Sequence, residues 1–206
     1  MNRRMILALA TGFVTVTRFA SGALPAQPGG TPVRLRGTIN AIAADKLELT
    51  LRDHSEASVR VAQSVRIIWL TEAQPSDIKQ GSYVGTAAIP QADGSLKALE
   101  VQVFPPSMRG VGEGTRPWDT GAGSSMTNGT VGSLVRANGR IITITYKGGE
   151  KRVLVPDDVP IVTYEPADRS ALSPGAHVLI NGRRAVDGTI AAISIAVGKN
   201  GLVPPM

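Results

Sequence analysis

The strongest constraint in this sequence is an internal duplication. Residues 33–104 and 129–197 align with an offset of 92 to 94 residues, which is the signature of a repeated structural unit. Each match joins turn residues to a short apolar run. The pairs are Gly37-Thr38-Ile39 with Gly129-Thr130-Val131, Val59-Arg60-Val61 with Val153-Leu154-Val155, 81–84 with 175–178, and 93–96 with 187–190. Because four pairs occur in the same order, we expect two copies of one fold.

Apolar residues recur at every second position within each copy. Leu47, Leu49 and Leu51 alternate with polar residues, and Ile142 and Ile144 do the same in the second copy. A period of two places one face of a strand on a core and the other in solvent, which is typical of antiparallel sheets. Only short pieces near residues 76–80 and 169–172 have helical character, and a glycine ends each within about one turn. The sequence therefore predicts an all-β protein.

The number of short strands in each copy favours a small closed barrel, because closure removes exposed strand edges. The predicted architecture is two tandem small antiparallel β-barrels, OB-like in type, joined by a Gly/Pro-rich linker. A split SH3-like barrel is the alternative. A barrel of this size is only marginally stable alone. Since the chain contains no cysteine, no disulfide can reinforce it, and we expect the two copies to pack together.

Three segments carry a resemblance to a known family. They are residues 33–39 (VRLRGTI), 77–84 (DIKQGSYV) and 93–98 (DGSLKA). The chain resembles an uncharacterised family of exported bacterial proteins built from OB-like β-barrel repeats, catalogued as a domain of unknown function. The resemblance covers both repeats. It implies export and a small β-barrel, and it implies no established catalytic residue.

The N-terminal segment has the pattern of a secretory signal peptide. A basic start at Arg3 and Arg4 precedes a twelve-residue apolar run, and small residues then surround a cleavage site after Ala23 or Ala26. We assign residues 1–26 to the signal and expect a periplasmic or secreted protein, with the arginine pair allowing a twin-Arg route. An uncleaved anchor is the alternative. No later segment has the length and apolarity of a membrane span.

Removal of this segment lowers the net charge of the chain. The full chain carries a net charge of +6, and three arginines of residues 1–26 are lost with the signal, which leaves +3. This small excess favours solubility and does not indicate a nucleic-acid surface. Nucleic acid is therefore not an expected partner. The remaining chain is expected to form the two barrels from residues 27–104 and 129–206.

The linker, residues 105–128, contains the densest set of chemically useful side chains. It is rich in glycine and proline and has no strand period. A tryptophan in such a segment normally buries against a surface, and arginine can hold a carboxylate or phosphate with two hydrogen bonds. The linker is interpreted as a packed clasp, a wall of a ligand site or a loose hinge. The predicted ligand-binding residues are Arg109, Arg116, Trp118 and Asp119.

Signals for other chemistry are weaker. Absent cysteine excludes thiol catalysis and cysteine-bound metals, and no Gly-x-Ser-x-Gly nucleophile elbow is present. The weak metal candidates are Asp53, His54 and Glu56, which also fit an ordinary solvated turn. No cofactor is expected.

The sequence thus predicts an exported, non-catalytic binding or adaptor protein of the bacterial cell envelope. Its partner would be a small ligand, a glycan or an envelope protein. Two alternatives are open, namely a soluble accessory of metal uptake or metal tolerance, and a hydrolase with its site between the barrels.

Overall fold

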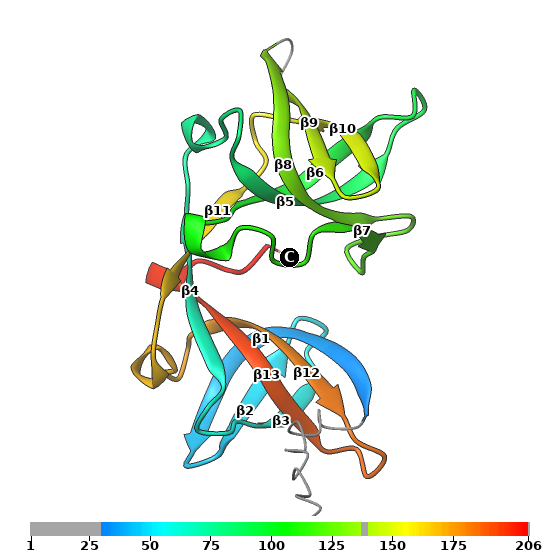
Figure 1. Cartoon of the computed structure of the whole chain (residues 1–206). Helices are drawn as coiled ribbons and strands as arrows, with labels where there is room; N and C mark the ends of the chain where they lie inside the picture. Colours follow the sequence, from blue (N-terminus) through cyan, green and yellow to red (C-terminus); the bar gives the residue numbers. More distant parts are fainter. Residues whose placement is uncertain (1–29, 137–139, 206) are drawn as a thin grey trace, which may run out of the picture.

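The chain folds into one large mixed β-sheet. Figure 1 shows the computed structural model, which describes residues 30–136 and 140–205. Within these residues the regular elements are strands and four single-turn 3-10 helices, so the predicted all-β class is confirmed. The predicted signal peptide lies outside the described residues. No helix in the described part of the chain is long and apolar enough to cross a membrane.

Each half of the chain supplies one series of strands. The first half contains β1 (Thr31–Ala43), β2 (Lys46–Leu51), β3 (Glu56–Arg60), β4 (Arg66–Glu72), η1 (Pro75–Asp77), β5 (Tyr83–Pro90) and β6 (Leu96–Val103). The connecting segment contains η2 (Pro106–Met108) and β7 (Gly114–Pro117). The second half contains β8 (Ser125–Arg136), β9 (Arg140–Tyr146), β10 (Gly149–Val155), β11 (Ile161–Pro166), η3 (Arg169–Ala171), β12 (His177–Arg184), β13 (Ile190–Gly198) and η4 (Lys199–Gly201).

The strands pair in two closed rings, and each ring takes strands from both halves. In the first ring, β1, β2 and β3 of the first half are closed by β13 and β12 of the second half. In the second ring, β8, β9 and β10 of the second half are closed by β6 and β5 of the first half. Figure 1 shows the two rings one above the other.

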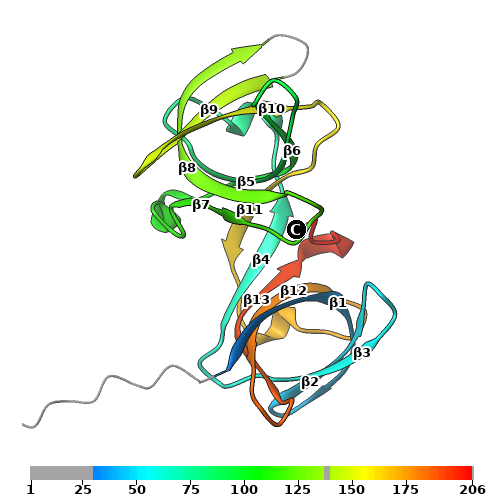
Figure 2. The ribbon, with the colours of Figure 1, turned by 90° about the vertical axis from the view of Figure 1, so that its right-hand side faces the viewer.

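Two strands cross between the rings. β4 and β11 pair with each other in antiparallel register, from Glu72 with Val162 to Ile68 with Pro166. β4 also extends the first ring by pairing with β13, and β11 extends the second ring by pairing with β6. Figure 2 shows β4 running from one ring toward the other. The crossing pair therefore joins both rings into one sheet.

The register repeats when the two halves are exchanged. Thr38 on β1 pairs with His177 on β12, and the equivalent Thr130 on β8 pairs with Tyr83 on β5. The irregularity in β1 at Ile39/Ala41 likewise recurs in β8 at Val131/Ser133. The duplicated sequence thus specifies a duplicated pattern of pairing.

The predicted tandem arrangement, with residues 27–104 and 129–206 each closing a unit of their own, is not confirmed. Each half is divided after its third strand, and its last two strands close the ring begun by the other half. The physical reason is that both copies offer equivalent closing strands. Strand periodicity alone cannot indicate which copy closes which ring.

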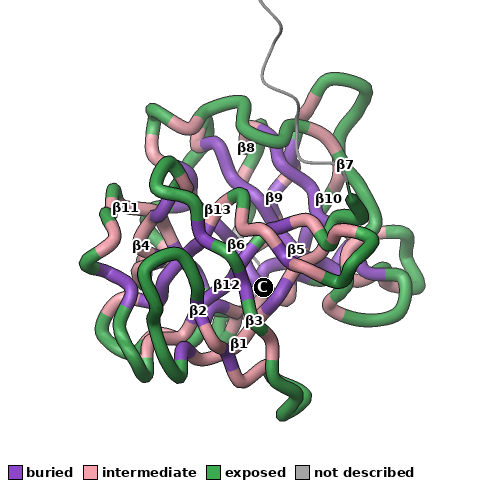
Figure 3. The backbone as a smooth tube through the Cα atoms, turned by 90° about the horizontal axis from the view of Figure 1, so that it is seen from below, coloured by how far each residue is buried: buried purple, intermediate pink, exposed green. Residues whose placement is uncertain are grey.

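Two apolar cores fill the rings. The first includes Leu49, Val59 and Ile195, and the second includes Val101, Ile142 and Val153, all of which are fully buried. Figure 3 shows that buried residues are concentrated on the strands and exposed residues on the connecting turns. Each such buried aliphatic side chain stabilises the fold by about 1.5–3 kcal/mol. Both cores are therefore built jointly by the two halves.

Candidate functional site

A cavity of about 720 Å³ lies where the two rings meet, and we call it the interface cavity. Its walls come from the start of β1, the end of β2, the middle of β5 and β6, residues 119–120 and the C-terminal segment. The charged side chains lining it are Arg34, Arg36, Arg52, Asp53, Glu100 and Asp119. Because strands of both rings contribute, the cavity exists only when the rings are assembled.

The duplicated pattern is broken at this cavity. The pairing register makes Arg34 and Arg36 of β1 equivalent to Met126 and Asn128 of β8. It also makes Glu100 and Gln102 of β6 equivalent to Ser194 and Ala196 of β13. The core positions of the two copies stay apolar, whereas residues 34, 36 and 100 are charged and their equivalents are neutral. The charged lining of the interface cavity is therefore a feature of one copy only.

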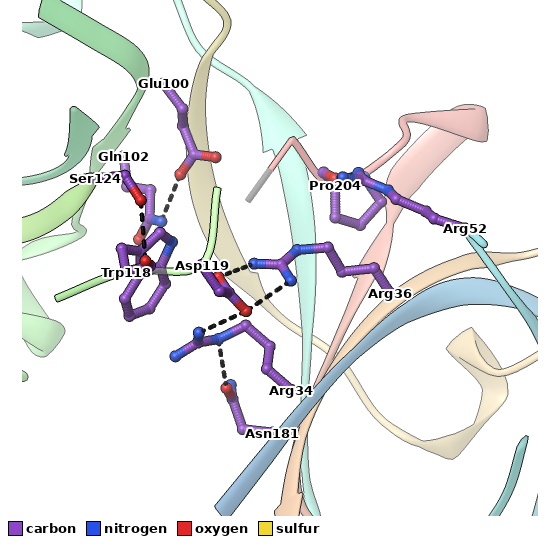
Figure 4. A network of polar contacts seen from close by, with 10 residues as sticks. All are labelled: Arg34, Arg36, Arg52, Glu100, Gln102, Trp118, Asp119, Ser124, Asn181 and Pro204. Atoms are coloured by element: carbon purple, nitrogen blue, oxygen red, sulfur yellow. Dashed lines mark hydrogen bonds and ion pairs between the residues drawn. The ribbon is translucent and has the colours of Figure 1, made fainter. Parts of the chain in front are cut away.

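Asp119 holds two of the arginines from the opposite wall. Its carboxylate accepts hydrogen bonds from Arg36 at 2.8 and 3.0 Å and forms an ion pair with Arg34 at 3.1 Å. Figure 4 shows both guanidinium groups converging on this carboxylate. The hydrogen bonds from Arg36, followed by the charges of Arg36 and Arg34, lower the pKa of Asp119 to about 2. The group is thus ionised at every pH near neutrality.

Arg52 is held differently from Arg34 and Arg36. Its guanidinium donates a hydrogen bond to the backbone oxygen of Pro204 in the C-terminal segment. Burial, together with the nearby charge of Arg36, lowers the pKa of Arg52 below its ordinary value. Within residues 30–136 and 140–205, no carboxylate lies within ion-pair distance of it. The lining thus includes one positive charge that the described side chains leave without a direct counterion.

Glu100 is a buried carboxyl group on β6, with 2% of the residue exposed. Its Oε1 accepts a hydrogen bond from Gln102 Nε2 at 2.6 Å, while its Oε2 is buried and has no hydrogen-bond partner among the described residues. Burial raises the pKa of Glu100 to about 8, although Arg36, Arg52 and Gln102 act in the opposite direction. The folded state keeps a proton that the unfolded chain loses, so stability falls as the pH rises from about 4.5 to about 8.

The connecting segment is a strap packed across the junction of the rings. We use strap for residues 105–124. Its strand β7 pairs with β8, and Trp118 packs against an apolar cluster that includes Leu70, Met126 and Leu179. The Arg34 guanidinium lies 3.5 Å from the centre of the Trp118 ring. These contacts fix Asp119, the next residue, at the mouth of the interface cavity.

The strap residues predicted from sequence fall in three places. Asp119 lines the interface cavity. Arg116 and Trp118 line a neighbouring cavity of about 260 Å³, together with Phe104 and Tyr164. Arg109 lies apart, where it donates hydrogen bonds to the Gly81 backbone oxygen at 2.6 Å and to Thr130 Oγ1 at 3.3 Å. The structure therefore does not bring these four residues into one site.

Of the weak metal candidates, Asp53 and His54 occupy a turn after β2, and Glu56 begins β3. Asp53 accepts hydrogen bonds from the backbone and hydroxyl of Ser55, and His54 has a left-handed backbone with φ of 66°. His54 and His177 line one cavity of about 260 Å³, but no carboxylate lines it. In the described part of the chain, no three histidine or acidic side chains gather as a metal site would require.

Sequence reasoning missed Arg34, Arg36, Arg52 and Glu100. Each lies on or next to a regular strand and fits the expected alternation of polar and apolar positions. A usable signal was nevertheless present. Comparison of the two copies shows charge at residues 34, 36 and 100 where the other copy has Met126, Asn128 and Ser194. Divergence between otherwise equivalent strands marks the position of the cavity.

Comparison of the chain with protein-family models, curated proteins and solved structures found no match.

Proposed function

We propose that this protein is an exported, non-catalytic binding protein of the bacterial cell envelope. Its ligand would be a small molecule with an anionic group, such as a carboxylate, sulfate, phosphate or acidic sugar, held in the interface cavity. We also infer that each ring is a small OB-like barrel, because its five strands close with one parallel pairing between β3 and β13 or between β10 and β6.

The observation that carries the proposal is the clustering of three guanidinium groups in one cavity. Arg34 and Arg36 come from β1 and Arg52 follows β2, so one ring provides all three. Guanidinium groups bind oxyanions through paired hydrogen bonds and keep their charge at neutral pH. Asp119 neutralises part of this charge. The guanidinium of Arg52 instead donates a hydrogen bond to a backbone oxygen. A ligand oxyanion would supply the remaining counterion.

Export is supported by the N-terminal sequence pattern of residues 1–26. A periplasmic or secreted location would expose the cavity to small ligands, glycans and other envelope proteins. The location and the choice among these partners are part of the proposal.

A hydrolase is the second candidate function, and one observation favours it. Glu100 and Asp119 line the same cavity with pKa values of about 8 and about 2. Two carboxyl groups separated in this way can divide the roles of acid and base between them. Binding is preferred because Asp119 is already engaged by Arg34 and Arg36. Turnover of chromogenic acidic glycosides by the wild type, abolished by Glu100→Gln, would favour hydrolysis.

Replacement of Arg52 by glutamine is expected to weaken anion binding at least about tenfold, because one charge-assisted hydrogen bond contributes about 1.5–3 kcal/mol. Isothermal titration calorimetry of sulfate, phosphate and glucuronate at fixed ionic strength measures this change. Arg152→Gln is the matched control, since Arg152 is exposed on β10 away from the cavity. Equal affinity in wild type and Arg52→Gln, or no binding of any of these anions, would contradict the proposed site.

A further inference from the structure

The hydrogen bonds around Glu100 run in one direction. The Tyr164 hydroxyl on β11 donates to Gln102 Oε1, which leaves the Gln102 amide nitrogen to donate to Glu100 Oε1 at 2.6 Å. Burial raises the pKa of Tyr164, so its phenol stays protonated and remains the donor. This chain of contacts determines which oxygen of Glu100 accepts the hydrogen bond from Gln102. The other oxygen, Oε2, is the one left for the cavity.

The proton of Glu100 is placed by the same contacts. An amide N–H can only donate, so Oε1 acts as the acceptor and a neutral carboxyl group carries its hydrogen on Oε2. Figure 4 shows Oε1 turned toward Gln102 and the other oxygen turned away from it. With a pKa of about 8, the group is mostly protonated at neutral pH. A buried hydroxyl donor without an acceptor is costly, and a ligand oxygen would relieve that cost.

We propose that Glu100 Oε2 donates a hydrogen bond to the bound oxyanion beside Arg36 and Arg52, so that ionisation of Glu100 releases the ligand. This inference rests on the proposed function and specifies which kind of anionic group the cavity would accept. The ligand group must accept hydrogen bonds on several sides, as carboxylate, sulfate and phosphate do. Loss of the proton would remove a donor and introduce a negative charge against the anion.

Other titratable groups near Glu100 keep their charge over the relevant pH range. Arg36 of β1 and Arg52, which follows β2, act on Glu100 as positive charges. Asp119 of the strap and Asp53 after β2 have lowered pKa values and stay anionic. Tyr164 reaches Glu100 only through Gln102 and stays neutral. Glu100 is therefore the group in this cavity that changes charge between about pH 6 and about pH 9.5.

The test is calorimetric titration of the purified protein with sulfate, whose charge is constant from about pH 6 to about pH 9.5. Wild-type affinity is expected to fall more than about tenfold over this range, because the ionised form binds poorly. Glu100→Gln keeps a neutral N–H donor in the position of the Oε2 hydroxyl. It is expected to bind sulfate equally well at both pH values, at a strength near that of the wild type at about pH 6.

The outcomes separate the two proposals. Sulfate binding that depends on Arg52 but has the same pH profile in wild type and Glu100→Gln would overturn the role of Glu100 and leave the binding site intact. Failure of sulfate to bind at about pH 6 would overturn the role of Glu100, and failure of phosphate and glucuronate as well would overturn the binding site too. If Glu100→Gln does not fold, infrared difference spectra of the wild type decide. A protonated carboxyl band at neutral pH that shifts on sulfate addition supports the inference, and an ionised carboxylate at neutral pH overturns it.

Discussion

Separate chains of residues 27–104 and 105–206 are expected to lack cooperative unfolding as monomers, and mixing them is expected to restore it. Each half alone has three strands of one ring and two strands of the other. A half therefore cannot bury either apolar core, since the residues of each core come from both halves. Without this burial, the conformational entropy of the chain is not offset.

The measurement combines thermal unfolding by circular dichroism with light scattering after size-exclusion chromatography. We expect an equimolar mixture to form a one-to-one complex that melts in one transition, as the intact chain does. The intact chain cleaved after folding, at a protease site inserted in the strap at Gly121, is the control for a broken connection between the halves. Two halves that each melt cooperatively as monomers would contradict the exchange of strands between the rings.

Alanine at Gly37 or Gly129 is expected to destabilise the protein by about 2–3 kcal/mol. A Cβ atom at Gly37 would lie 2.3 Å from the Thr50 backbone oxygen, and one at Gly129 would lie 2.4 Å from that of Thr145. These oxygens belong to neighbouring strands and cannot move without distorting the sheet. Near Gly37 and Gly129, β1 and β8 change partners from one neighbouring strand to another, which requires a close backbone approach.

Chemical denaturation of both variants measures the loss, and Gly132→Ala is the control on the same strand as Gly129. A Cβ at Gly132 would meet the Thr145 side-chain hydroxyl at 3.0 Å, which can rotate away. We expect this control to lose less than about 1 kcal/mol. Similar losses at Gly129 and Gly132, or no loss at Gly37, would show that the two strands do not approach each other as closely as described.

The strand content and the duplication could be predicted from sequence because both are local patterns. Alternation at Leu47, Leu49 and Leu51 places these residues on β2, and the turn pairs recur at equivalent positions. Exchange of the closing strands could not be predicted. The partner of β12 is chosen by long-range packing, and β1 and β8 offer it the same glycine-containing pattern.

Of the residues around the cavity, those of the strap could be predicted from sequence and those of the strands could not. The unusual composition of the strap drew attention to Trp118 and Asp119, and Asp119 does line the interface cavity. Glu100 gave no local signal, because a single acidic residue on a strand normally faces solvent. Its surroundings are completed by Arg36 and Arg52 of the first ring and Asp119 of the strap, which line the same cavity. The cavity is thus a product of assembly, which sequence periodicity does not report.

Cysteine crosslinking tests most directly whether each ring is built from both halves. The chain has no cysteine, so paired substitutions introduce its only thiols. Thr38→Cys with His177→Cys joins residues that pair across β1 and β12, within disulfide range. Thr38→Cys with Tyr83→Cys joins residues that would pair only if the first half closed on itself. Strand exchange predicts an intrachain disulfide in the first monomeric variant and none in the second, and the reverse result would contradict it.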